Sequence, residues 1–161
     1  MGDSKEILER DRGNVWMDGD RRQYSKIQSV QNLETVINEG LRVALLEETP
    51  DQSLEVLLEH LGKALNGERT YIFERNEAGG DDNTYEWAAD GVKPEKENLQ
   101  NVPAQVCAGW YRNFSIGKHI VIENLEEIRE SEPLQYENLK RQKVHSLVVV
   151  PLYDGKKLIG F

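Results

Sequence analysis

The apolar segment over residues 146–152 places the tightest constraint on the fold. Its sequence, Ser-Leu-Val-Val-Val-Pro-Leu, lacks polar alternation and predicts a strand buried on both faces. Asp154 and Gly155 form a tight-turn pair, and residues 157–161 then resume a strand pattern. We therefore expect an antiparallel hairpin here, and the apolar run is far too short to cross a bilayer.

Two helices are expected in the first part of the chain. Apolar residues spaced three or four apart predict a leading helix over 27–48, although Gly40 costs it about 1 kcal/mol relative to alanine. A second helix begins at Thr49 and Pro50, where Gln52 completes a capping box. Two interpretations of the leading helix stay open: it packs on its own domain, or it pairs with a second copy as a short coiled coil.

Short strands and helices alternate in the remainder. Residues 70–74 and 84–88 are rich in aromatic and β-branched types and predict two antiparallel strands, joined by an exposed acidic loop over 76–83. A third helix is expected after Pro103, followed by a strand over 119–122.

A fourth helix is expected from Ser131 and Pro133 to about residue 142. In this helix Leu134 and Leu139 are the predicted apolar anchors. It should therefore be short and mostly exposed.

Composition excludes several classes of protein. The net charge is −9, which disfavours nucleic acid and anionic membranes as partners. Cys107 is the single cysteine, so no intrachain disulfide or cysteine-based metal cluster is possible, and the three histidines have no metal-ligand spacing. No secretory signal is recognisable in residues 1–26, which we interpret as a linker, so a cytoplasmic protein without membrane insertion is expected.

The order of elements and three local sequences resemble a GAF domain. The similar sequences are residues 67–74, 117–124 and 139–161, the last with a VPL-type strand, a turn and an IG-type strand. The resemblance covers 49–161 and implies an α+β, PAS-related fold. Its central antiparallel β-sheet would have about five to six strands with helices on both faces. Because the sequence stops at Phe161, the last strand and the C-terminal helix are expected to be truncated.

The first strand, with Trp87 in the second, is similar to GAF domains beside GGDEF (diguanylate cyclase) domains in bacterial signalling proteins. This resemblance implies a sensory module that binds an unknown small molecule, or dimerises through the leading helix, to control a cyclic di-GMP output. The alternative is a ligand-free dimerisation scaffold.

Candidate pocket residues follow from where a GAF domain holds its ligand, between one sheet face and the crossing helices. Flat or apolar ligands stack on aromatic side chains, although the same residues could simply form the core. The candidate residues are Tyr71, Phe73, Trp87, Trp110, Tyr111, Ile120, Ser146 and Val148.

Enzymatic interpretations are disfavoured, and no cofactor or metal is expected. The NKFDE-type motif of cyclic-nucleotide-binding GAF domains is missing, and Cys107 precedes alanine rather than the histidine common at bilin-attachment cysteines. One cysteine also leaves a methionine sulfoxide reductase of GAF fold without a resolving thiol. The acidic pairs Asp81-Asp82 and Glu126-Glu127 are expected to be solvent-exposed charges rather than acid–base groups.

Overall fold

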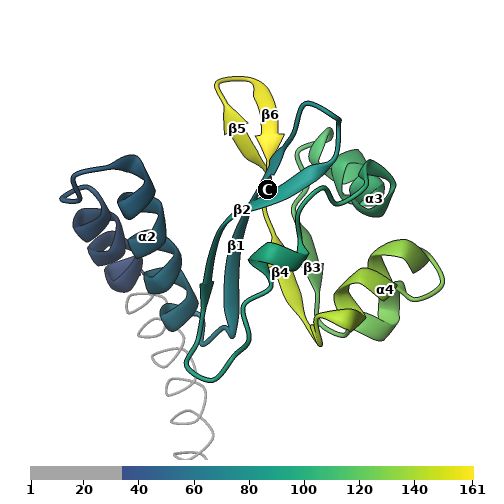
Figure 1. Cartoon of the computed structure of the whole chain (residues 1–161), viewed down its shortest axis with the longest axis horizontal. Helices are drawn as coiled ribbons and strands as arrows, with labels where there is room; N and C mark the ends of the chain where they lie inside the picture. The colour runs from purple at the N-terminus through teal and green to yellow at the C-terminus, as the bar shows by residue number, and fades with distance from the viewer. Residues whose placement is uncertain (1–33) are drawn as a thin grey trace, which may run out of the picture. The chain divides into compact units, whose positions relative to one another are not determined.

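The computed structural model describes residues 34–161 (Figure 1). It divides into two compact units, of which the first ends at Ala64 and the second spans Leu65–Phe161. In the described residues no helix is both long and apolar enough to span a membrane. The expected linker over 1–26 and the expected start of the leading helix at residue 27 lie outside the described residues.

Two helices make up the described part of the first unit. The leading helix is described over 34–44 and gives way to turns at 45–46, so its predicted end at residue 48 is wrong. The second helix, α2, spans Pro50–Ala64. Thr49 caps it through its hydroxyl, which accepts from the Gln52 amide and donates to the Gln52 side chain, as the capping box predicts.

Gly40 has a packing role in this unit. A Cβ atom built on Gly40 would lie 2.9 Å from Cβ of His60 in α2, closer than side chains approach. The glycine therefore lets the two helices come together, and this contact offsets its poor helix propensity.

A β-hairpin opens the second unit. Strand β1 covers Arg69–Arg75 and β2 covers Asp81–Ala88. Ile72 pairs with Tyr85 and Phe73 pairs with Asn83, so the register shifts by one residue and leaves a bulge there. The loop predicted over 76–83 is too long, because residues 81–83 pair with β1. Asn76 closes the shorter turn by accepting the Gly80 amide at 2.9 Å.

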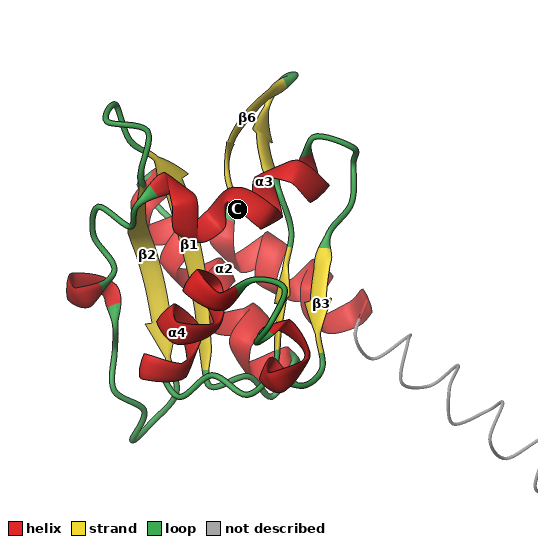
Figure 2. Cartoon of the chain, turned by 90° about the vertical axis from the view of Figure 1, so that its right-hand side faces the viewer, coloured by secondary structure: helices red, strands yellow, loops and turns green. Residues whose placement is uncertain are grey.

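The six strands of the described residues form two antiparallel sheets. The larger has the order β2-β1-β6-β5, in which β5 spans Leu152–Asp154 and β6 spans Lys157–Gly160. The smaller pairs β3, Ile120–Ile122, with β4, Leu147–Val149. The predicted α+β class with antiparallel strands is confirmed (Figure 2), although no single sheet holds all six.

The apolar run at 146–152 is not one strand buried on both faces. It breaks between β4 and β5 near Pro151, which cannot donate to a ladder. Val148 and Val150 are 65% and 54% exposed, whereas Val149 is buried. Only one face of this segment therefore meets the core.

Helix α3, Ala104–Phe114, and helix α4, Pro133–Arg141, supply the helical side of the core in this unit. Single-turn helices η1, Lys96–Asn98, and η2, Leu125–Ile128, lie in the connections. Leu139 is buried as predicted, but Leu134 is exposed and Tyr136 and Gln135 are buried instead. The prediction for Leu134 failed because Tyr136 can bury its ring while its hydroxyl reaches the Glu126 carboxylate at 2.8 Å.

Candidate functional site

The face of the β1–β2 hairpin that meets the core carries an unusual row of polar side chains. Residues opposite each other in an antiparallel pair point to the same face, and the register pairs Tyr71 with Glu86, Phe73 with Asn83, and Arg75 with Asp81. Tyr71 and Phe73 pack against the buried core. We call this side the inner face; its residues are Tyr71, Phe73, Arg75, Asp81, Asn83 and Glu86.

Asp81 is completely buried on the inner face. One carboxylate oxygen, Oδ1, accepts from the Tyr111 hydroxyl at 2.6 Å and from Arg75 Nε at 3.4 Å. The Arg75 guanidinium lies 3.7 Å from the centre of the Tyr111 ring, a cation–π contact that fixes both groups. The second oxygen, Oδ2, has no hydrogen-bond partner.

Asn83 is also completely buried and has an unpartnered oxygen, Oδ1. Its amide nitrogen donates to Glu86 Oε2 at 3.4 Å, and the Glu86 carboxylate accepts the Glu95 backbone amide at 2.9 and 3.0 Å. The Glu86 carboxylate fixes the orientation of the Asn83 amide, because the reverse orientation would place two acceptors together. A buried acceptor without a partner costs about 1–3 kcal/mol, so a hydrogen-bond donor placed against either oxygen would stabilise the domain.

The segment after η1 closes the free edge of β2 over these residues. Asp81 and Val102 exchange backbone hydrogen bonds of 3.0 and 2.9 Å, and the backbone amide of Asn83 donates to the Leu99 carbonyl at 2.9 Å. Leu99 and Val102 are both buried. The two unpartnered oxygens are thereby sealed from bulk water.

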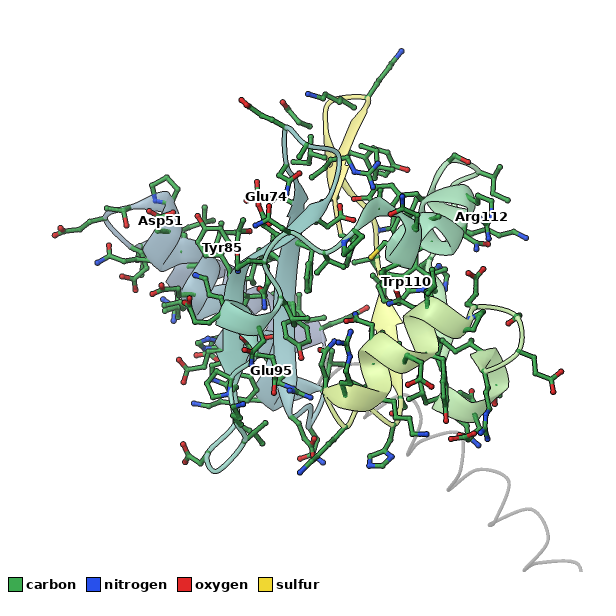
Figure 3. The ribbon with its side chains drawn as sticks, turned by 45° about the vertical axis from the view of Figure 1, so that its right-hand side comes forward. Asp51, Glu74, Tyr85, Glu95, Trp110 and Arg112 are labelled. Atoms are coloured by element: carbon green, nitrogen blue, oxygen red, sulfur yellow. The ribbon has the colours of Figure 1, made fainter. Side chains whose placement is uncertain are left out.

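An aromatic cluster lies beside the polar row. The Phe161 ring stacks on Phe73 with centroids 5.0 Å apart, and Trp110 meets its edge at 5.3 Å. Trp110 projects from α3 toward α4 (Figure 3). Tyr71, Tyr111 and Phe114 complete the cluster at centroid separations of 5.7–6.0 Å. The aromatic side chains fill this part of the core with one another.

Burial controls the ionisation of the groups around Asp81. Burial, with the Asp81 charge and hydrogen bond added, raises the pKa of the Cys107 thiol to about 12. Burial and then the hydrogen bond to Asp81 also raise the pKa of Tyr111. Both groups therefore stay neutral at physiological pH, which makes Cys107 a poor nucleophile. Residues 34–161 hold no group of three metal-binding side chains.

A pocket of about 240 Å³ opens at the turn end of the hairpin, away from the predicted residues. Two of its polar lining side chains are already paired, because the Asn76 side chain donates to Asp82 at 3.2 Å and to Asn101 at 3.3 Å. The lining residues are Asn76, Ala78, Gly80, Asn101, Pro103, Ala104 and Gln105.

A family model for the GAF domain matches residues 49–161, which include the whole hairpin and the helices that face it. The chain belongs to the GAF-domain family. It is a sensory and regulatory domain of the kind that signalling proteins carry. A curated relative, methanogenesis regulatory histidine kinase FilI of Methanothrix harundinacea (strain 6Ac), is 31% identical over 117 residues. That match covers 69% of this chain but 13% of the relative, so the chain spans only a small part of its length.

Solved GAF-type structures share the fold at low sequence identity. The far-red absorbing dark state of JSC1_58120g3 with bound biliverdin IXa aligns with a TM-score of 0.65, 15% identity and 78% of each chain covered. The phycoerythrobilin-bound GAF domain from a cyanobacterial phytochrome aligns with a TM-score of 0.62 and 17% identity, covering 80% of this chain and 77% of that one.

The GAF domain gathers five of the eight candidate pocket residues in one cluster. Tyr71, Phe73, Trp110, Tyr111 and Ile120 are part of the buried core or pack against it. Trp87 pairs with Thr70, which puts it on the face of the hairpin opposite to the inner face. Ser146 and Val148 are exposed.

Sequence reasoning missed the polar half of the site. Asp81 was expected in an exposed loop, and that prediction is wrong because its side chain is completely buried. Asp and Asn have low strand propensity, which hid the first part of β2. The available signal was hairpin symmetry: a seven-residue β1 needs a partner of similar length, and β2 reaches this only by including Asp81.

Proposed function

We propose that this GAF domain binds a small molecule at the inner face of the β1–β2 hairpin and relays its occupancy to an output domain. One observation carries the proposal: Asp81 and Asn83 are completely buried, and each keeps an oxygen without a partner. Ligand pockets combine apolar walls with a few convergent polar groups. The aromatic cluster beside these oxygens supplies such a wall.

The output domain is proposed to belong to a longer signalling protein. The first strand and Trp87 favour a diguanylate cyclase, whereas the name of the curated relative favours a histidine kinase. We propose no enzymatic activity for the GAF domain itself, because Cys107 is buried and its raised pKa disfavours a reactive thiolate. A cytoplasmic location is part of the same proposal.

A thermal-shift screen of the whole chain tests the binding proposal. The library should include biliverdin, cyclic nucleotides and small metabolites of each charge type, because a ligand that binds only the folded state raises the Tm. We expect at least one compound to do so, with at least tenfold weaker binding to Asp81→Asn. Glu127→Gln removes an exposed carboxylate and should leave binding unchanged. Failure of every compound, or binding indifferent to Asp81→Asn, would overturn the proposal.

A second candidate function is the ligand-free dimerisation scaffold. The aromatic cluster is filled by its own side chains, and Leu41, Leu45 and Leu46 at the end of the leading helix are 44%, 84% and 72% exposed. Pairing with a second copy would bury these leucines. Sedimentation velocity over a range of concentrations should then show a dimer that Leu45→Glu converts to a monomer. A monomer at all concentrations would exclude this function.

A further inference from the structure

The turn after helix α2 contains an asparagine followed directly by a glycine. Asn66-Gly67 is the only such pair in the sequence. Glycine has no side chain to shield its backbone nitrogen, so this nitrogen can attack the amide of the preceding asparagine side chain. Every other asparagine of the chain precedes a larger residue, which hinders this attack. The sequence therefore distinguishes Asn66 as a candidate for spontaneous chemistry.

The surroundings of Asn66 leave its side chain open to water. Asn66 is exposed, and the preceding Leu65 is 62% exposed. In the described residues no side-chain hydrogen bond holds Asn66, whereas the side chains of Asn83 and Asn98 both donate to carboxylates. Cyclisation needs free rotation of the side chain and access of water, and both conditions are met.

The backbone of the turn depends on the asparagine rather than on the glycine. Asn66 has a φ of 51°, in the left-handed region that asparagine tolerates and that often follows the last turn of a helix. Gly67 is not one of the glycines with a positive φ in residues 34–161. An alanine at position 67 can therefore adopt the same backbone conformation.

The connection that contains Asn66 has little slack. Helix α2 ends at Ala64 and strand β1 begins at Arg69, and the Glu68 carbonyl accepts the Ala89 amide at 2.9 Å. The same connection joins the first compact unit, which ends at Ala64, to the second. A new charge or an additional backbone atom here therefore acts directly on the end of α2.

We propose that Asn66 is a site of spontaneous modification, at which the side-chain amide is converted to aspartate and isoaspartate. The Gly67 backbone nitrogen bonds to Asn66 Cγ, the bond from Cγ to Nδ2 breaks, and Nδ2 leaves as ammonia with the Gly67 amide proton. Water then opens the cyclic imide at either carbonyl. Opening at Cγ gives aspartate, and opening at the main-chain carbonyl gives isoaspartate, in which the backbone runs through Cγ. The net reaction consumes one water and releases one ammonia.

Both products destabilise the last turn of α2. Each adds a negative charge at the carboxyl end of the helix, where the helix dipole favours cations. Lys63, the basic residue of that turn, already pairs with Glu59. Isoaspartate also adds a methylene group to the backbone of a short connection. We therefore expect the end of α2 to fray in the modified chain.

Peptide mapping of the whole chain tests the site. The folded chain would be incubated under physiological conditions, and Asn66 would be compared by mass spectrometry with Asn98, which is also exposed but precedes Leu99. We expect Asn66 to be converted at least tenfold faster than Asn98, to a mixture of aspartate and isoaspartate. Equal rates, or an Asn66 that stays intact in the folded chain but is converted in the urea-unfolded chain, would overturn the inference.

Two variants separate the chemistry from the structure of the turn. Gly67→Ala places a methyl group beside the attacking nitrogen and should slow conversion of Asn66 about tenfold. Asn66→Gly removes the reacting amide and keeps a residue suited to the left-handed backbone, so it should abolish the modification without lowering the Tm. Conversion as fast in Gly67→Ala as in the unchanged chain would overturn attack by Gly67.

Hydrogen exchange tests the effect on α2. The isoaspartate and unmodified chains would be separated by ion exchange, and their backbone amides compared. Amides in the last turn of α2 should exchange at least tenfold faster in the isoaspartate chain, whereas the Phe73 amide in β1, which donates to Phe161, should not change. Equal exchange at the end of α2 would contradict the expected fraying. Asn66 lies outside the inner face, so these results are independent of the ligand screen.

Discussion

Asp81 couples several side chains of the inner face through a single carboxylate oxygen. Tyr111 donates to Oδ1 at 2.6 Å, and Arg75 approaches the same oxygen while its guanidinium covers the Tyr111 ring. Without the Tyr111 hydroxyl, the buried carboxylate would lose its shortest hydrogen bond and keep the longer contact with Arg75 and the weak thiol donor of Cys107. The stability of the domain should therefore depend on this hydroxyl more than on a tyrosine hydroxyl in water.

Tyr111→Phe should lower the free energy of unfolding by about 1–3 kcal/mol, because it leaves a charged acceptor underpaired in the core. Urea unfolding followed by tryptophan fluorescence measures this change. Tyr153→Phe is the matched control: the Tyr153 hydroxyl donates to the Phe114 carbonyl, but the residue is 48% exposed. Loss of the Tyr153 hydroxyl should lower the free energy of unfolding by less than loss of the Tyr111 hydroxyl. An equal decrease would contradict the role given to Asp81.

Cys107 should be inert in the folded protein. Its pKa is raised to about 12 from an ordinary 9.0. At pH 8 iodoacetamide should therefore alkylate it at least 100-fold more slowly in the native chain than in the urea-unfolded chain.

The same shift has a consequence for stability at high pH. The unfolded chain loses the thiol proton above pH 9, while the folded chain keeps it until about pH 12. The thiol's contribution to the free energy of unfolding is fully present below pH 9. It is lost between pH 9 and about pH 12, by up to about 1.4 kcal/mol per pH unit. Cys107→Ala should remove this part of the pH dependence when the free energy of unfolding is measured by urea titration from pH 8 to pH 11. An unchanged dependence on pH would contradict the raised pKa of Cys107.

At the scale of elements, the hairpin and β6 are joined by a very close backbone approach. Phe73 and Phe161 exchange backbone hydrogen bonds of 2.8 and 2.9 Å. A Cβ atom on Gly160 would lie 1.9 Å from the Phe73 carbonyl oxygen. Only glycine fits at that point, so β6 holds Phe161 in the aromatic cluster through this contact.

Gly160→Ala should cost at least about 2 kcal/mol of stability, because backbone atoms of β1 cannot move aside without breaking strand pairing. Gly109→Ala in α3 provides the contrast. The three atoms nearest its Cβ would all belong to the carboxylate of Glu132, a flexible side chain that can turn away from its ion pair with Arg112. Alanine also favours the helix, so we expect a change within about 1 kcal/mol. Equal losses in thermal unfolding would contradict this packing.

Local signals predicted most elements, whereas burial required tertiary information. The Thr49 cap and the turn glycine Gly155 depend on neighbouring residues only, and both lie where the sequence indicates. The β1–β2 bulge and the exposure of Val148 depend on partners distant in the chain. The same is true of the burial of Asp81, which follows from pairing with Val102, and local propensity therefore did not predict this half of the candidate site.

At the scale of the whole molecule, the family assignment identifies a sensory domain, and the inner face is the ligand site that we propose for it. The GAF match identifies the domain, and the curated relative shows that similar sequences occur in a regulatory histidine kinase. Under the proposed function, the two buried oxygens are where this chain would bind its ligand. Occupancy there would act on α3 through Tyr111 and on β6 through Phe73 and Phe161.

The most direct test is a crystal structure of the chain with the highest-affinity compound of the thermal-shift screen. The account predicts a donor atom of that compound within about 3 Å of Asp81 Oδ2 and of Asn83 Oδ1. A compound bound elsewhere on the surface, with only ordered water on these two oxygens, would contradict it.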